Sequence, residues 1–328
     1  MKTKRHRQST WRITAPFLAA TQTALCLLAY PSSAAELDFR TGDVIAFLGG
    51  EDTVAMNEHG YLELLLTKAW SGEESPIQFR NLGWEGDTVF EQRRDLNFGS
   101  WAEQLSRSKA TVLFCQFGNA EALQGTEHLA EFVTAYGHLL DEWSRHVRRI
   151  VVLSPTPFES AESHLPDLAS RNGDVGAYSE AIRGLADQRG LIFIDLCQPL
   201  LSAKDKSIAW TRDGLHLNGE GHWRVAKETV AQLGLNDMTQ RIWFDTKSHE
   251  LAPGRNEQAR QEILRKNRLW FDYWRPMNWA FLAGDRTEQP SSRDHRDPSV
   301  RWFPLEMQKF LPLIEQRESD IQSLLRQP

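Results

Sequence analysis

The strongest constraint on the fold is an alternation of short apolar segments with longer segments that carry apolar residues at helical spacing. Longer amphipathic segments of this kind lie at 61–70, 121–148, 175–189 and 220–233. The short apolar runs read as buried strands, and they lie at 43–48, 77–81, 110–115, 149–153 and 191–195. Such an alternation predicts a five-stranded parallel sheet covered by helices on both faces, and a chain of 328 residues can bury a large core.

Glycine and polar residues gather where the predicted strands end. Ligands of open parallel sheets bind outside the carboxyl ends of the strands, so these segments are the first candidates for a binding site. Four loops converge there, which a set of independent turns does not explain. The candidates are 49–51 after the first strand, 83–86 after the second, Gly118 and Asn119 after the third, and Asp213 and His216 after the fifth.

The segment after the fifth strand carries a carboxylate and an imidazole three residues apart. Asp213 can orient the ring of His216 and stabilise its charged form, which leaves the second ring nitrogen for a reacting group. Asn218 then suits the N-cap of the helix expected at 220–233. Taken alone, an Asp-x-x-His is as well explained by a capping loop that happens to contain a histidine. Its position beside the other three loops favours a functional pair.

The first two of these segments resemble blocks of the SGNH/GDSL hydrolase family. Gly42-Asp-Val-Ile-Ala-Phe-Leu-Gly49 is similar to the strand that leads into the family's Gly-Asp-Ser. Asn81-Leu-Gly-Trp-Glu-Gly86-Asp-Thr88 is similar to the family's second block. The resemblance implies that Gly86 donates its backbone N–H to an oxyanion hole.

The last two segments complete the resemblance, which covers roughly residues 40–235. Phe117-Gly-Asn119-Ala matches the third block at its asparagine, which the resemblance makes a side-chain donor to the oxyanion hole. Asp213-Gly-Leu-His216 matches the last block fully. The family implies a three-layer α/β/α sandwich with flavodoxin-like strand order. It also implies ester hydrolysis, with an acyl group on a carbohydrate or similar extracellular substrate as the expected target.

The chain departs from the family at the nucleophile. Alignment of the first block places Gly50 at the family's aspartate and Glu51 at its serine. A shift by one residue offers Asp52, and Thr53 lies one residue further. No serine occurs between Ser33 and Ser71, and Glu51 has no hydroxyl for His216 to deprotonate.

Three interpretations of Glu51 follow from its chemistry. In the first, which we favour, Glu51 accepts hydrogen bonds from the oxyanion donors and pairs with His216, so that the site binds a ligand without cleaving an ester. In the second, Glu51 acts as a general base or as a covalent nucleophile, as carboxylates do in glycoside hydrolysis. In the third, Glu51, Asp213 and His216 form an oxygen-rich metal site, although no metal-ligand spacing supports it. We therefore expect no cofactor and no metal.

Some polar and aromatic residues near these segments have structural interpretations that are equally good. Asn172 lies at the start of the helix expected at 175–189 and suits a cap. His222 lies within the next helix, where a packing or surface role is the commoner one. Trp84 is a candidate for a pocket wall.

The first 35 residues are typical of a secretory signal peptide. Five cations precede a mostly apolar stretch at 13–30, and Ser33-Ala-Ala35 offers small residues for cleavage before Glu36. A membrane anchor is the alternative, but Gln22 and several threonines interrupt the stretch. We expect an exported protein, periplasmic or extracellular, without a membrane span after cleavage.

Charge and cysteine content restrict the partners. The chain has 38 Lys and Arg against 44 Asp and Glu, and removal of the five leader cations brings the net charge from −6 to −11. An acidic protein of this kind is a poor partner for nucleic acid, so we expect a small-molecule or carbohydrate ester as ligand. Cys115 and Cys197 lie in separate strand-like runs, which favours two buried free thiols over a disulfide. Nothing in the sequence fixes the oligomeric state.

The sequence changes in character beyond about residue 238, and we divide the mature chain into a hydrolase-like domain at 36–238 and a helical, tryptophan-rich extension at 239–328. Helices are expected at 256–274 and 305–325, with an exposed polar loop at 285–300. We expect Trp270, Trp274, Trp279 and Trp302 to dock the extension onto the sheet domain. A lid over the site and a partner-binding surface both remain open as its role.

Overall fold

The computed structural model describes residues 38–72, 76–160, 164–203 and 208–326. These residues belong to one compact unit. The expected leader and its cleavage site lie outside the described residues. No helix within the described residues combines the length and the apolar composition that crossing a membrane requires.

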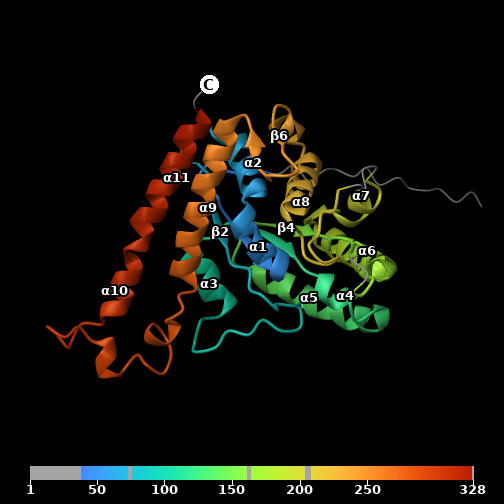
Figure 1. Cartoon of the computed structure of the whole chain (residues 1–328). Coiled ribbons are helices and arrows are strands. Elements are labelled where there is room, and N and C mark those ends of the chain that lie inside the picture. Colours follow the sequence, from blue (N-terminus) through green and yellow to red (C-terminus); the bar gives the residue numbers. More distant parts are fainter. Residues whose placement is uncertain (1–37, 73–75, 161–163, 204–207, 327–328) are drawn as a thin grey trace, which may run out of the picture. The chain divides into compact units, whose positions relative to one another are not determined.

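A five-stranded parallel sheet forms the centre of the fold (Figure 1). Its order is β2-β1-β3-β4-β5, which is the flavodoxin-like order expected from the family resemblance. The strands begin and end within three residues of the predicted runs. They are β1 (Val44–Gly49), β2 (Gln78–Asn81), β3 (Val112–Gln116), β4 (Arg149–Leu153) and β5 (Ile192–Ile194).

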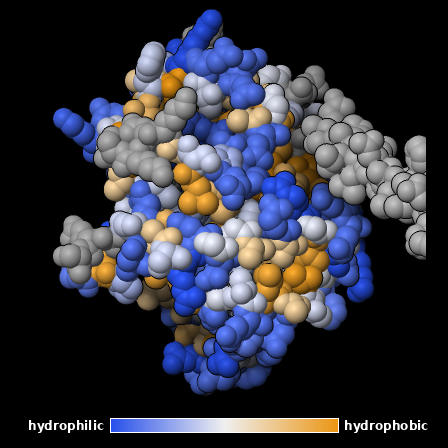
Figure 2. Space-filling view, turned by 90° about the vertical axis from the view of Figure 1, so that its right-hand side faces the viewer, coloured by the Kyte–Doolittle hydropathy of each residue, from blue (hydrophilic) through white to orange (hydrophobic). Residues whose placement is uncertain are grey.

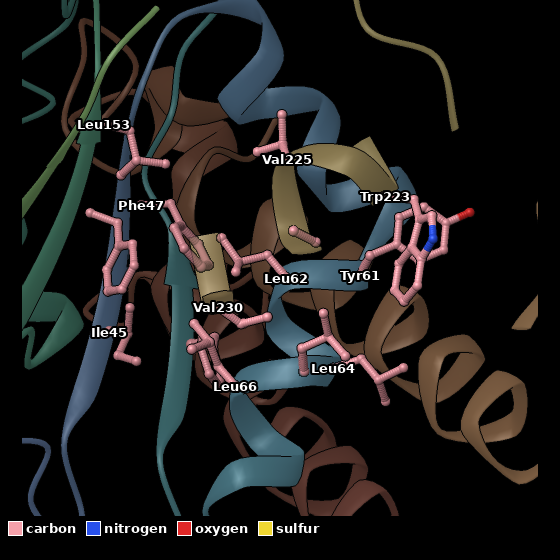
Figure 3. Packing of buried hydrophobic residues seen from close by; sticks show 14 of the residues in the cluster. Ile45, Phe47, Tyr61, Leu62, Leu64, Leu66, Leu153, Trp223, Val225 and Val230 are labelled. Carbon is pink, nitrogen blue, oxygen red and sulfur yellow. The ribbon is translucent and has the colours of Figure 1, made fainter. Parts of the chain in front are cut away.

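One face of the sheet is covered by α1 (Glu51–His59), α2 (Tyr61–Ala69) and α8 (Gly219–Gln232). Because strand side chains alternate, Ile45 and Phe47 of β1 point to this face and meet Leu62 and Leu66 of α2 (Figure 3). Every one of these four side chains is buried. The run Leu64-Leu65-Leu66 is fully buried because α2 packs between the sheet and other helices.

The opposite face is covered by α3 (Trp101–Ser108), α5 (Leu129–Trp143) and α6 (Asn172–Arg189), which confirms the three-layer architecture. Ala46 and Leu48 of β1 point to this side. Cys115 and Cys197 are buried and free, as predicted. The surface in Figure 2, which includes the side of α6 to α8, is mainly hydrophilic and shows hydrophobic residues in small separate groups.

The predicted long helix at 121–148 is wrong, because the segment consists of three shorter pieces. A short helix α4 (Asn119–Ala122) ends before Gly125, a 3₁₀ turn covers Thr126–His128, and α5 follows. Gly125 has a φ of 82°, a left-handed conformation that interrupts a helix. Helical spacing of the apolar residues continues across this break, so the pattern alone did not reveal it.

The C-terminal extension contains a small hairpin of β6 (Trp243–Phe244) and β7 (Leu251–Ala252), followed by three helices. These helices are α9 (Gly254–Trp274), α10 (Trp302–Gln308) and α11 (Phe310–Arg326), and α11 runs beside α9 (Figure 1). Ala259 and Ile263 of α9 join the core on one face of the sheet, whereas Trp270 and Trp274 join the core on the other. Because β2 is an edge strand, α9 covers the edge that would otherwise be open.

One buried and one partly buried ion pair connect the extension to the sheet domain. Lys266 Nζ lies 2.5 Å from Glu63 Oε1, and Arg80 Nη1 lies 2.6 Å from Glu318 Oε1. The indole N–H of Trp270 donates to the carbonyl of Asn81 at 2.9 Å. Loss of one partner from a buried pair costs about 3–5 kcal/mol, so the extension is an integral part of the packed structure.

Two of the four tryptophans named for docking, Trp270 and Trp274, are buried against the sheet domain. Trp279 contacts the loop before α3, where its indole N–H donates to the carbonyl of Leu96. Trp302 instead donates to the carbonyl of Ser291 within the extension. The last tryptophan therefore stabilises the polar loop at 285–300.

Candidate ligand pocket

A pocket of about 260 Å³ lies at the carboxyl ends of β1, β2 and β3. The loops that follow these strands and the segment before α8 all contribute to it. Glu51, Gly86, Asn119 and His216 were singled out from the sequence, and all four line this pocket. The remaining lining residues are Gly50, Asp52, Thr53, Asp87, Gln116, Phe117, Gly118, Ala120, Glu121, Leu123 and Leu215.

The Asp213–His216 pair is formed. Nδ1 of His216 lies 2.6 Å from Oδ2 of Asp213, and the backbone N–H groups of Leu215 and His216 donate to Oδ1 at 3.0 and 2.8 Å. Partial burial alone would raise the pKa of Asp213, but these hydrogen bonds outweigh it and lower the pKa to about 2. Asp213 therefore stays ionised and fixes the ring of His216, whose edge is exposed in the pocket.

Glu159 holds the loop that carries this pair, and sequence reasoning missed it. Its Oε2 accepts hydrogen bonds from the N–H groups of Trp210 and Thr211 and from the hydroxyl of Thr211, at 2.8 to 2.9 Å. Its own N–H donates to the carbonyl of Gly214 at 2.9 Å. The only available signal was its place after the fourth strand, because a single glutamate forms no motif.

Glu51 is the first residue of α1. A carboxylate is favourable there because it faces the positive end of the helix dipole. The side chain is exposed, and it hydrogen-bonds to no other residue of the described segments. The bridge expected from Glu51 to the N–H of Gly86 and the amide of Asn119 is therefore not formed here.

Asp52 is the second carboxyl group of the pocket. Its Oδ1 accepts the N–H of Leu217 at 3.2 Å, so it lies next to His216. Burial raises the pKa of Asp52 to about 6, because it outweighs the Leu217 hydrogen bond and the charge of His216, and the neighbouring Glu51 adds to the rise. One imidazole is thus flanked by a carboxylate that stays ionised and a carboxyl group that can carry a proton.

The side chain of Asn119 lies in the pocket, but its amide already has partners. Nδ2 donates to the carbonyl of Thr156 at 2.9 Å and to the hydroxyl of Thr156 at 3.1 Å. Both acceptors belong to Thr156, so the amide NH₂ is directed toward this residue. Donation from Asn119 to an oxyanion would compete with this contact.

Thr53 supplies the only side-chain hydroxyl among the residues that line the pocket. It is buried, and a Cβ atom at Gly49 would approach its Oγ1 to 2.2 Å. The carbonyl of Thr53 accepts the Nδ2 of Asn81 at 2.6 Å. Thr53 therefore packs against Gly49, where any larger residue would clash with it. It is poorly placed to act as an exposed nucleophile.

Gly86 lies at the tip of a turn from Trp84 to Asp87, in which the N–H of Asp87 donates to the carbonyl of Trp84 at 3.1 Å. Gly86 has a φ of 79°, as the third position of such a turn requires. Asp87 lines the pocket but is paired with Arg94 by two hydrogen bonds of 2.8 and 2.6 Å. The Trp84 ring packs against Phe98 and Trp274 and does not line the pocket, contrary to its candidate role as a wall.

The remaining candidates have structural roles. Asn172 exchanges two hydrogen bonds with the backbone of Phe158, at 2.7 and 2.9 Å, instead of capping its helix. His222 is buried and stacks on His59 with 4.2 Å between ring centroids. Across the described segments, no three histidine, cysteine or acidic side chains are grouped so that they could hold a metal ion.

The fold and the pocket define a class: an α/β protein with hydrolase architecture, in which an Asp–His pair lies at a pocket beside the sheet. The sequence profile of the GDSL-like Lipase/Acylhydrolase family matches residues 42–224, and the chain belongs to this family. The match includes the last block with Asp213 and His216.

The solved structures to which this chain is similar include the following three. A gut microbial diltiazem-metabolizing enzyme is 23% identical with a TM-score of 0.45, and the match covers 60% of this chain and 48% of that enzyme. A catalytic mutant of an acetylxylan esterase from Geobacillus stearothermophilus is 18% identical, with a TM-score of 0.45 and coverages of 60% and 96%. An alpha/beta hydrolase from the metagenome of Lake Arreo, Spain, is 17% identical, with a TM-score of 0.45 and coverages of 60% and 98%. A search of curated proteins found no match.

Proposed function

We propose that this chain binds an acylated small molecule or carbohydrate in the pocket and does not cleave esters by the serine mechanism of its family. The observation that carries this proposal is the absence of an accessible hydroxyl among the described lining residues. Glu51 occupies the nucleophile position, and the one lining hydroxyl, that of Thr53, is buried. A carboxylate at this position cannot be turned into an alkoxide by His216.

The polar groups of the pocket support ligand binding. His216, oriented by Asp213, can donate to or accept from a ligand oxygen, and the turn at Gly86 presents backbone to the same space. Phe117, Leu123 and Leu215 supply apolar contact surface. This combination suits a ligand with a polar core and a short apolar group, such as an acetylated sugar.

Hydrolysis by a directly activated water is the second candidate function, and the intact Asp213–His216 pair favours it. In that reaction Nε2 of His216 takes a proton from water, and the resulting hydroxide attacks the ester carbonyl carbon. The bond to the alcohol oxygen then breaks, and the protonated His216 returns the proton to that oxygen. Such a reaction would be slow, because Thr156 competes with an oxyanion for the amide of Asn119.

Assays of the wild type and two variants distinguish ligand binding from ester hydrolysis. The full chain, Glu51→Ser and His216→Ala are assayed with p-nitrophenyl acetate, and ligand binding is followed by the shift in melting temperature with acetylated xylo-oligosaccharides. We expect the wild type to be inactive but stabilised by a ligand, and Glu51→Ser to gain turnover. Turnover by the wild type that His216→Ala abolishes would refute the binding function and support the water mechanism.

We also propose that the chain is exported. The basic residues, apolar stretch and small residues within the first 35 positions support this. Expression of the full chain in a bacterial host, followed by N-terminal mass determination of the processed form, tests it. We expect a mature protein that begins at Glu36, and recovery of only the unprocessed chain from the cytoplasm would contradict export.

A further inference from the structure

The turn at Gly86 has open space on one side of its tip. A Cβ atom built at Gly86 would meet no heavy atom within 4 Å, so no side chain packs on that side of the glycine. Gly86 and Asp87 nevertheless form part of the pocket wall. The position of this wall therefore depends on what holds the flanks of the turn.

Two arginines hold those flanks. The guanidinium of Arg94 lies 4.3 Å from the centroid of the Trp84 ring and also pairs with Asp87. The guanidinium of Arg275 lies 3.6 Å from the same ring and pairs with Glu85. Glu85 and Asp87, on the two sides of Gly86, thus each pair with an arginine. The ring of Trp84 contacts both arginines.

The two arginines come from different parts of the chain. Arg94 follows the turn in the sequence, whereas Arg275 is the C-cap of α9 in the extension. The neighbouring Trp274 also meets Trp84, edge to face, with 5.9 Å between ring centroids. The extension therefore reaches the pocket wall from behind, through Trp84 and Glu85, without lining the pocket itself.

The end of α9 that carries Arg275 is firmly placed. Lys266 and Trp270 bind Glu63 and the carbonyl of Asn81, and both α9 side chains are buried. Asn81 is the last residue of β2, which leads directly into the turn. Helix α9 thus contacts the start of the turn through Trp270. Arg275, five residues further along, contacts the middle of the turn through Glu85.

We propose that the extension at 239–328 is an internal brace for the ligand pocket, in which Arg275 and Trp274 position the turn that carries Gly86. This role differs from a lid and from a partner-binding surface. The brace would matter for ligand affinity only if the pocket binds a ligand, so this part of the proposal rests on the proposed function. The positioning itself is independent of any ligand.

Hydrogen exchange measured by mass spectrometry tests the brace in the full-length protein. In Arg275→Ala, amide exchange in peptides that cover 84–90 should become about tenfold faster, because the turn opens locally. Exchange in β3 and the melting temperature should stay as in the wild type. The matched control is Arg268→Ala, which removes an exposed arginine of the same helix that pairs with Asp272, and it should change nothing in these peptides.

A second variant keeps the test valid if Arg275→Ala folds poorly. Glu85→Gln removes the ion pair from the turn side, where the side chain is 43% exposed, and should speed exchange of the same peptides about threefold. Unchanged exchange at 84–90 in both variants would overturn the proposal, as would a uniform increase over the whole chain.

The effect on the site is read separately, in the Glu51→Ser background with p-nitrophenyl acetate. If this background is active, adding Arg275→Ala should lower kcat/KM about tenfold, and adding Arg268→Ala should not. If Glu51→Ser is inactive, this result counts against the proposed function of the pocket. The exchange experiment would still decide whether the extension braces the turn.

Discussion

A stacked pair of histidines should make the folded state less stable in acid. His59 is the last residue of α1, and His222 lies in α8. The rings of His59 and His222 stack with centroids 4.2 Å apart, and the carbonyl of His59 accepts a hydrogen bond from Arg260 of α9. Burial, followed by the charges of Arg260 and His249, lowers the pKa of His59 to about 4. Burial, followed by His59, lowers the pKa of His222 well below its usual value.

The direction of the effect follows from proton linkage. His59 has a lower pKa in the folded state than the 6.5 of the unfolded chain, so between these values the unfolded chain binds more protons. Its contribution is fully favourable above the unfolded value and is lost as the pH falls toward the folded value. From about pH 7.5 to about pH 5, linkage with these two pKa values gives a loss of about 2 kcal/mol for His59 alone.

Asp52 acts in the opposite direction and must be separated from this effect. Its folded pKa of about 6 lies above the unfolded value of 3.8, so protonation of Asp52 stabilises the folded state as the pH falls. Over the same pH interval its gain amounts to about 1.4 kcal/mol, which would hide most of the loss at His59 in the wild type alone.

The assay is therefore a comparison of free energies of unfolding by urea for the wild type and His59→Gln at about pH 7.5 and about pH 5. Because Gln does not titrate, the wild type should lose about 2 kcal/mol more than the variant over this interval. His138→Gln, at an exposed position of α5, is the matched control and should behave as the wild type. Parallel losses in the wild type and His59→Gln would refute the reasoning.

Two further predictions concern stability. Lys266→Ala leaves the buried carboxyl group of Glu63 without its partner and should cost about 3–5 kcal/mol in urea unfolding, whereas a loss below about 1 kcal/mol would show that water reaches Glu63. Gly49→Ala places a Cβ 2.2 Å from Oγ1 of Thr53 and should cost at least about 1–3 kcal/mol, and an unchanged melting temperature would show that β1 and α1 can separate at this point.

The sheet was predictable because its information is local. Each strand is a short apolar run between polar turns, and burial on both faces of a parallel sheet requires such runs, so all five were found to within three residues. The break before α5 was not predictable in this way. Apolar spacing continues through it, and only the backbone at Gly125 shows that the helix stops.

The site was predictable in part. Convergence of the loops follows from parallel strands ending at one edge, so Glu51, Gly86, Asn119 and His216 were expected together, and the structure places all four around one pocket. The engagement of the Asn119 amide was not foreseen. Its partner, Thr156, is 37 residues away in the sequence and carries no pattern that would announce a hydrogen bond.

The sequence by itself determined the layered sheet, the edge at which the pocket lies and the pairing of Asp213 with His216, because these depend on periodicity and on spacings of a few residues. Only the tertiary structure decided which polar groups remain available in the pocket and where the extension packs. Those properties depend on contacts such as Arg275 with Glu85, which are 190 residues apart. A contact of that range depends on how every intervening element packs, and no local pattern of residues encodes it.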